Sequence, residues 1–215
     1  KIKQIIREEG PKNHLNKQGT PTMGGIFFVP IGIIISHILY FNKDDYKIIL
    51  ALTFLIIFFM LIGFIDDLLS LKKQLNTGLK SNQKLILQLF ISIIFIIFCA
   101  SNSFIPNTVQ IANSYINIGN LIYPLGIFVL LAESNSTNLT DGLDGLLSGC
   151  SVLIFTGLAI TILIENPSNN LTLAPFCMVM AGACMGFLFL NKYPAKLFMG
   201  DSGSLAIGAS LGGVA

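Results

Sequence analysis

The residues with the clearest chemical potential are five aspartates in three short motifs, each next to a long apolar run. The first motif, GFIDD at residues 63–67, places Asp66 and Asp67 side by side. Adjacent carboxylates repel each other unless a cation or water separates them, and neighbouring helical side chains point about 100° apart. The pair is therefore either part of a functional site or a hydrated stop at the end of a helix, and this motif alone does not decide between the two.

The second motif, NLTDGLDG at residues 138–145, spaces Asn138, Asp141 and Asp144 three residues apart. At that spacing a helical turn would put the three side chains on one side, where they could converge on a polar ligand. A plain helix cap by Asn138 or Thr140 is the simpler alternative. A cap needs one such residue, however, and three are offered, so the spacing favours a binding site.

The third motif, FMGDSGS at residues 198–204, lies where a loop enters the last apolar run. A helix start there would offer free N–H groups to a phosphate, and Asp201 a carboxylate to its metal ion. An ordinary cap would look similar in isolation. The same loop also carries a hydrogen-bond donor and two cations, which favour a phosphate-binding site over a plain cap: Asn191, Lys192 and Lys196.

A fourth segment, GPKNHLNKQGTPTMGG at residues 10–25, is rich in turn-forming residues and cations. Its lysines and hydroxyls, Lys17 and Thr22 among them, could contact a diphosphate or the head group of an anionic lipid. Composition alone would also fit a positively charged flank of a membrane span.

The elements that must position these motifs are membrane-spanning helices. The chain is 53% hydrophobic and only 11% charged, with a mean hydropathy of +0.75, which excludes an ordinary soluble surface. Apolar runs long enough to cross a hydrocarbon core of about 30 Å recur along it. We predict one all-α polytopic transmembrane domain over residues 1–215 with about seven spans, at roughly 24–41, 47–65, 85–100, 121–133, 143–164, 171–190 and from Ser204 onward.

The span at 121–133 is short for a full crossing, and the stretch 104–120, with β-branched and polar residues in rough alternation, predicts a small hairpin or an interfacial segment. His37 lies inside a span and is read as a packing residue rather than a ligand. The four cysteines form no CxxC pair or Cys/His cluster, so neither a disulfide framework nor a zinc site is predicted.

The distribution of charge predicts the orientation. With the N-terminal segment in the cytoplasm, eleven of the thirteen cations fall in cytoplasmic loops or at their margins and two, Lys43 and Lys47, fall outside. The five motif aspartates then lie at the cytoplasmic ends of spans. Carboxylates near lipid are costly unless paired, hydrated or metal-bound, so one shared site on this face is the working hypothesis.

The segment GPKNHLNKQGTPTMGG resembles the signature of the phospho-N-acetylmuramoyl-pentapeptide transferases. GFIDD, NLTDGLDG and FMGDSGS follow in the family's order, so the resemblance extends over the whole chain. It implies a magnesium-dependent enzyme of the bacterial plasma membrane that transfers phospho-N-acetylmuramoyl-pentapeptide from a UDP carrier to undecaprenyl phosphate. The products are UMP and lipid I, the first lipid-linked peptidoglycan intermediate. No nucleic acid partner is expected, and a homodimer is allowed.

For individual residues, we expect Asp66, Asp67 and Asp201 to be catalytic and to bind Mg²⁺, with Asp201 as its main ligand. We expect the substrates to contact Lys17, Thr22, Lys84, Asn138, Asp141, Asp144, Asn191 and Phe198. Lys17 and Lys84 would hold the acceptor phosphate, which Asp66 orients or deprotonates, and Phe198 would face the uracil.

Family members have about ten spans and a histidine-rich cytoplasmic loop that this sequence lacks. We therefore expect the chain to be truncated at both ends and inactive alone. Two alternatives remain: an N-acetylglucosamine-1-phosphate transferase of the same superfamily, or an ion-coupled transporter. Transporter carboxylates usually lie near the middle of the bilayer, whereas these cluster at one face.

Overall fold

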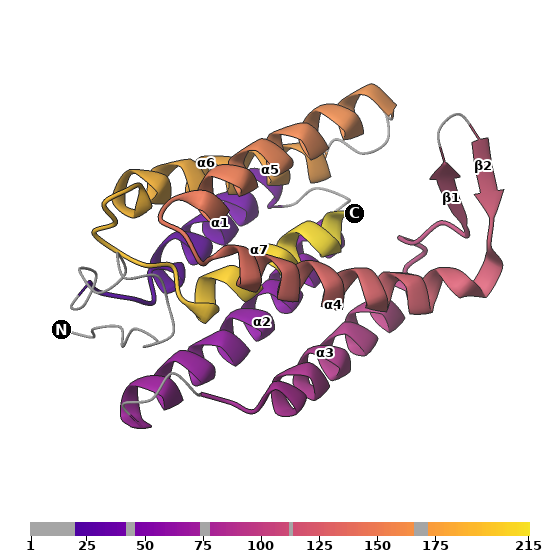
Figure 1. The fold of residues 1–215 in the computed structure, drawn as a ribbon. Coiled ribbons are helices and arrows are strands. Elements are labelled where there is room, and N and C mark those ends of the chain that lie inside the picture. The colour runs from indigo at the N-terminus through magenta and orange to yellow at the C-terminus, as the bar shows by residue number, and fades with distance from the viewer. Residues whose placement is uncertain (1–19, 42–45, 74–77, 112–113, 166–171) are drawn as a thin grey trace.

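The computed structural model describes residues 20–41, 46–73, 78–111, 114–165 and 172–215. These residues form seven α-helices and one small antiparallel sheet (Figure 1). The helices are α1 (Gly25–Tyr40), α2 (Tyr46–Lys73), α3 (Ser81–Ser101), α4 (Ile122–Thr140), α5 (Leu146–Glu165), α6 (Leu173–Asn191) and α7 (Asp201–Val214). The prediction of an all-α polytopic membrane protein is confirmed.

Four of these helices, α2, α3, α5 and α6, are long and apolar enough to cross a bilayer, and α1 is a shorter apolar helix of 16 residues. Large apolar side chains stay exposed along them, for example Phe27 on α1 and Phe90 on α3, exposed to 69% and 63%. Such surfaces would be a liability in water but suit hydrocarbon, as expected of membrane-spanning helices.

Two predicted boundaries were wrong, and both errors bear on the site. Helix α2 continues to Lys73, so Asp66 and Asp67 lie inside a helix rather than at its end. Helix α4 continues to Thr140 and takes in the polar run that follows residue 133. In both cases the helix extends beyond its apolar stretch, because backbone hydrogen bonding continues where hydropathy falls.

The predicted hairpin is present. Strands β1 (Thr108–Ile111) and β2 (Ser114–Asn117) pair antiparallel, with Thr108 opposite Asn117 and Ile111 opposite Ser114. The hairpin stands beside the ends of α3 and α4, away from the three aspartate motifs (Figure 1).

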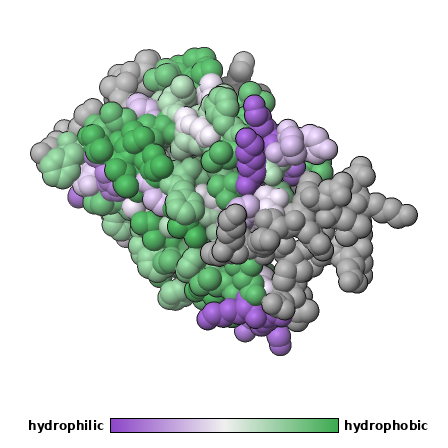
Figure 2. All heavy atoms as spheres, turned by 90° about the vertical axis from the view of Figure 1, so that its left-hand side faces the viewer, coloured by the Kyte–Doolittle hydropathy of each residue, from purple (hydrophilic) through white to green (hydrophobic). Residues whose placement is uncertain are grey.

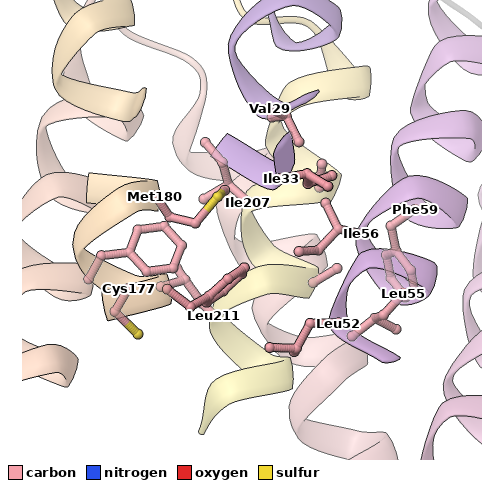
Figure 3. Close-up of a cluster of buried hydrophobic side chains, with 14 of the residues drawn as sticks. Val29, Ile33, Leu52, Leu55, Ile56, Phe59, Cys177, Met180, Ile207 and Leu211 are labelled. Carbon is pink, nitrogen blue, oxygen red and sulfur yellow. The ribbon is translucent and has the colours of Figure 1, made fainter. Parts of the chain in front are cut away.

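Helix α7 is the centre of the bundle and packs against α1, α2 and α4, while α5 and α6 pair beside them (Figure 1). Every residue from Ser202 to Leu211 is buried. The apolar core around it takes Val29 and Ile33 from α1, Leu52 and Phe59 from α2 and Met180 from α6 (Figure 3). The start of α7, which carries Asp201, is thus held by several helices at once.

Two further features concern His37 and the cysteines. The two ring nitrogens of His37 hydrogen-bond the hydroxyls of Tyr46 and Thr53, each at 2.9 Å, so this histidine joins α1 to α2. All four cysteines are free thiols.

Candidate functional site

A cluster of charged side chains forms where α2, α3 and the start of α7 meet. The Lys84 ammonium lies 3.2 Å from Oδ1 of Asp66 and donates a hydrogen bond of 2.5 Å to Oδ2 of Asp201. These residues come from three segments separated by long apolar runs. The structure therefore confirms that the first and third motifs converge on one place, together with Lys84.

Asp66 is buried, and its carboxylate also fixes the entry to α3. Its Oδ1 accepts a hydrogen bond of 2.9 Å from the Leu79 backbone N–H. Because Leu79 precedes α3 by two residues, this bond holds the start of α3 against α2. Lys84, one turn into α3, is thereby brought within reach of both carboxylates.

Asp67 has a different role from its neighbour. Its two oxygens accept hydrogen bonds of 3.0 Å from the backbone N–H groups of Asp201 and Ser202. The first N–H groups of a helix have no partner within the helix and favour negative charge. The expectation that these groups would be free for a phosphate was therefore wrong, because a carboxylate from α2 already occupies them.

The backbones of α2 and α7 approach closely at this point. A Cβ atom added to Gly63 would lie 2.1 Å from the carbonyl oxygen of Asp201. Gly200, just before α7, has φ = 76°, a left-handed conformation that glycine adopts without strain. The glycines of the first and third motifs thus allow the contact on which the cluster depends.

The second motif reaches the same region but does not form one helical face. Asn138 donates to the Ser204 hydroxyl at 2.9 Å, and the Asp141 carboxyl lies near the Gly200 N–H. Helix α4 ends at Thr140, so Asp144 lies in the following turn and accepts from the Ala195 N–H at 3.1 Å. The expected arrangement of all three on one helical turn was wrong, because Asp144 lies beyond the end of α4 and contacts the loop before α7, whereas the other two lie beside the start of α7. Their binding of one ligand stays a prediction.

Asn191 is 1% exposed, and its amide joins two loops. Its Oδ1 accepts from the Gly145 N–H at 3.1 Å and from the Ser148 hydroxyl at 3.0 Å, and its Nδ2 donates to the Leu197 carbonyl at 3.1 Å. A role of Asn191 in substrate binding stays a prediction. Its hydrogen bond to the Leu197 carbonyl positions the loop that carries Phe198.

The segment before α1 runs beside the segment before α7. The Phe198 N–H donates to the Pro21 carbonyl, and the Gly24 N–H donates to the Phe198 carbonyl, each at 2.9 Å. Thr22 is therefore brought close to Phe198 and the start of α7. Lys17 lies outside the described residues.

Figure 2 looks at the end of the bundle that is on the left in Figure 1, and hydrophilic residues stand there among apolar surfaces. Exposed lysines gather in the segments around the cluster, namely Lys72, Lys73, Lys80, Lys192 and Lys196. The charged cluster thus lies at a cationic end of an otherwise apolar bundle.

Burial raises the pKa of the Asp141 carboxyl to about 8, with the charges of Asp201 and Asp67 adding to the effect. In the unfolded chain this carboxyl titrates near pH 4. The folded state therefore holds one more proton than the unfolded state between these values, and stability must fall as pH rises through the window.

We expect the melting temperature of the full-length protein, measured without divalent cations, to decrease from about pH 4 to about pH 8 for this reason. In Asp141→Asn the decrease should be shallower, since an amide does not titrate. Scanning fluorimetry in detergent across that range measures both. Equal slopes in the two proteins would contradict the assignment.

The same charges bear on metal binding. Magnesium takes oxygen ligands and is usually held by one or two carboxylates, with water and phosphate oxygens completing the shell. Among the described residues no three His, Cys, Asp or Glu side chains converge as a ready-made metal site. However, four aspartate carboxyl groups gather at this end of the bundle beside the single Lys84 ammonium: Asp66, Asp67, Asp141 and Asp201. The donor set therefore fits a cation that is held partly by a substrate.

The fold and this cluster define a class, the multi-pass membrane proteins with a polar, carboxylate-rich site at one end of the helix bundle. The profile of glycosyl transferase family 4 matches residues 49–215, and the first signature of the phospho-N-acetylmuramoyl-pentapeptide-transferases matches residues 17–29. The chain belongs to glycosyl transferase family 4.

Several curated relatives carry the name phospho-N-acetylmuramoyl-pentapeptide-transferase. One from Prochlorococcus marinus strain NATL2A is 82% identical over 215 residues, which is 100% of this chain and 58% of the relative. Another, from strain MIT 9313 of that species, is 49% identical over 100% of this chain and 58% of its own. A third, from Synechococcus sp. strain CC9605, is also 49% identical, over 100% of this chain and 62% of its own. The chain thus spans about three fifths of the relatives it matches.

Proposed function

We propose that the full-length protein transfers phospho-N-acetylmuramoyl-pentapeptide from its UDP carrier to undecaprenyl phosphate and releases UMP. The observation that carries the proposal is the contact of Lys84 with both Asp66 and Asp201 at the polar end of a membrane bundle. A phosphoryl transferase needs such a site in a membrane only if one of its substrates is a lipid. The names of the relatives support the particular group that is transferred.

In this reaction an oxygen of the lipid phosphate attacks the phosphorus atom next to the sugar. A new P–O–P linkage forms, and the bond to the bridging oxygen of the nucleotide breaks, so that UMP leaves with that oxygen. Both reactants are anionic, and positioning plus charge neutralisation account for most catalysis of such transfers. Lys84 supplies a cation at the required place, and Asp66 orients the attacking phosphate through Lys84.

The reaction has little need of a general base to deprotonate the acceptor phosphate. The second pKa of a phosphate monoester is about 6, so the acceptor is already largely ionised at neutral pH. For that reason we assign Asp66 an orienting role in preference to proton transfer. Lys17 is a second candidate for the acceptor phosphate.

For the donor we propose a surface formed by Thr22 and Phe198, which the two paired segments bring together, with Asn138 and Asp144 beside it. The Phe198 ring would face the uracil, and Asn191 would position that ring through the Leu197 carbonyl.

Magnesium is the proposed cofactor, and Asp201 and Asp66 are its proposed ligands. When bound, it would neutralise negative charge on the diphosphate. Of the three aspartates expected to bind Mg²⁺, Asp67 is the weakest candidate, because both its oxygens already accept hydrogen bonds from backbone N–H groups.

The cationic end of the bundle is proposed to face the cytoplasm at the bacterial inner membrane, in accord with the positive-inside rule. The nucleotide substrate would reach the site from that side.

Membranes containing the full-length protein test the proposal when they are supplied with undecaprenyl phosphate and either UDP-linked muramoyl-pentapeptide or UDP-N-acetylglucosamine. We expect UMP and a lipid-linked product from the muramoyl donor only. Product from the acetylglucosamine donor alone would favour the other transferase of the superfamily. Release of no UMP from either donor would contradict both transferase assignments.

A further inference from the structure

Helix α3 carries a second polar residue one turn deeper in the bundle than Lys84. This residue, Gln88, is completely buried, with 0% of its surface exposed. Its Oε1 accepts a hydrogen bond of 2.9 Å from Nδ2 of Asn135 on α4, and the same Nδ2 donates to the Leu131 carbonyl at 2.8 Å. The pair joins α3 to α4 inside an apolar bundle.

This contact closes a ring of side-chain contacts among three helices. Lys84 joins α3 to α7 through Asp201, Gln88 joins α3 to α4, and Asn138 joins α4 to α7 through the Ser204 hydroxyl. Residues three or four apart lie on one helix face. Lys84 and Gln88 thus share a face of α3, and the two asparagines share a face of α4, so each contact constrains the next.

Stability alone does not account for an amide at this position. Within the described part of the chain, Nε2 of Gln88 has no hydrogen-bond partner although it is buried. A buried donor without an acceptor is costly, and an apolar side chain of similar size would remove that cost. Polar pairs between membrane helices can, however, select one packing arrangement over others.

We propose that the Gln88–Asn135 pair is a positioning device that sets where α3 lies against α4 and α7, and so places Lys84 between Asp66 and Asp201. A misplacement of about 1 Å can reduce catalysis a hundredfold. The catalytic part of this inference rests on the proposed function, and the geometric part does not.

Gln88→Met is the first test, because methionine has a similar length and no amide. In the full-length protein we expect kcat to fall at least tenfold, with the donor KM unchanged and the melting temperature equal or higher. Ser92→Ala is the matched control: Ser92 is also buried on α3, but its hydroxyl donates only locally, to the Gln88 carbonyl. It should retain wild-type kcat. Parallel loss of stability and activity in Gln88→Met would overturn the proposal.

Exchanging the two residues is the second test. Gln88→Asn shortens the contact and Asn135→Gln lengthens it, so each single variant should lose activity. The double variant restores the combined length and should recover most of the lost kcat. Losses that simply multiply in the double variant would overturn the positioning role.

A third measurement does not depend on the reaction. Acylation of Lys84 by an amine reagent, followed by mass spectrometry, reports whether the ammonium is held between its carboxylates. The Lys84 side chain is 17% exposed, and its labelling rate should rise severalfold in Gln88→Met but not in Ser92→Ala. Increased labelling in a protein that transfers no phospho-sugar would refute the proposed function and leave the positioning role standing. Unchanged labelling would overturn the positioning role itself.

Discussion

Asp201→Asn in the full-length protein is expected to lower the rate of phospho-sugar transfer by about a thousandfold or more. Removing one preorganised electrostatic contact in an active site typically costs about a hundred- to a thousandfold. This substitution removes two at once, the partner of the Lys84 ammonium and the proposed main ligand of the cation. Asparagine keeps the size of the side chain, so the effect isolates the charge.

The measurement is single-turnover formation of the lipid product at saturating donor and over a range of magnesium concentrations. Glu133→Gln is the control. Glu133 is a half-buried acid on α4 and lies outside the charged cluster, so this variant should retain most of the activity. Near-wild-type turnover of Asp201→Asn at limiting magnesium would show that Asp201 is not the main ligand.

Gly63→Ala is the second substitution with a large expected effect, and it acts through the backbone. The added methyl group would lie 2.1 Å from the Asp201 carbonyl oxygen and 2.5 Å from the Ser202 nitrogen, so α7 must move away from α2. Overpacking of this kind costs about 1–3 kcal/mol, and occasionally more. The displacement also breaks the hydrogen bonds to Asp67, so we expect loss of detectable transfer.

Thermal unfolding in detergent, together with the transfer assay, measures both effects. Gly157→Ala on α5 is the matched control, because a Cβ atom there would meet nothing within 4 Å. Alanine is also the better helix former, so the control should be as stable as the wild type or more so. A Gly63→Ala protein with wild-type melting and activity would mean that α2 and α7 are less closely packed than described.

The sequence predicted the parts of this fold that depend on local pattern. Apolar runs indicated the helices, and rough alternation in residues 104–120 predicted a small hairpin or an interfacial segment. Asp66 and Asp201 were assigned to one site because carboxylates at a membrane boundary need a partner, and Lys84 was expected near Asp66 as a ligand of the acceptor phosphate. The helices and the hairpin follow from patterns within a short stretch of sequence, and the shared site follows from the cost of unpaired charge in lipid.

Other features depend on contacts between segments that no local pattern encodes. Asp66 and Asp67 are chemically identical neighbours, yet one binds Lys84 and the other accepts the N–H groups of α7. Asn191 appeared as a free donor in a loop, but the fold surrounds its amide with backbone groups. Gln88 was overlooked, although its position one turn after Lys84 was a usable signal.

The enclosure of α7 has a consequence for biogenesis. During synthesis Asp66 and Lys84 enter the membrane long before Asp201, and Ser202–Leu211 finds most of its surroundings among α1, α2 and α4, which precede it. Three serines and a pair of glycines in that stretch suit contact with protein better than contact with lipid. The charged cluster is therefore completed only when α7 docks, so a nascent chain stalled before that helix would be integrated in the bilayer without a finished site.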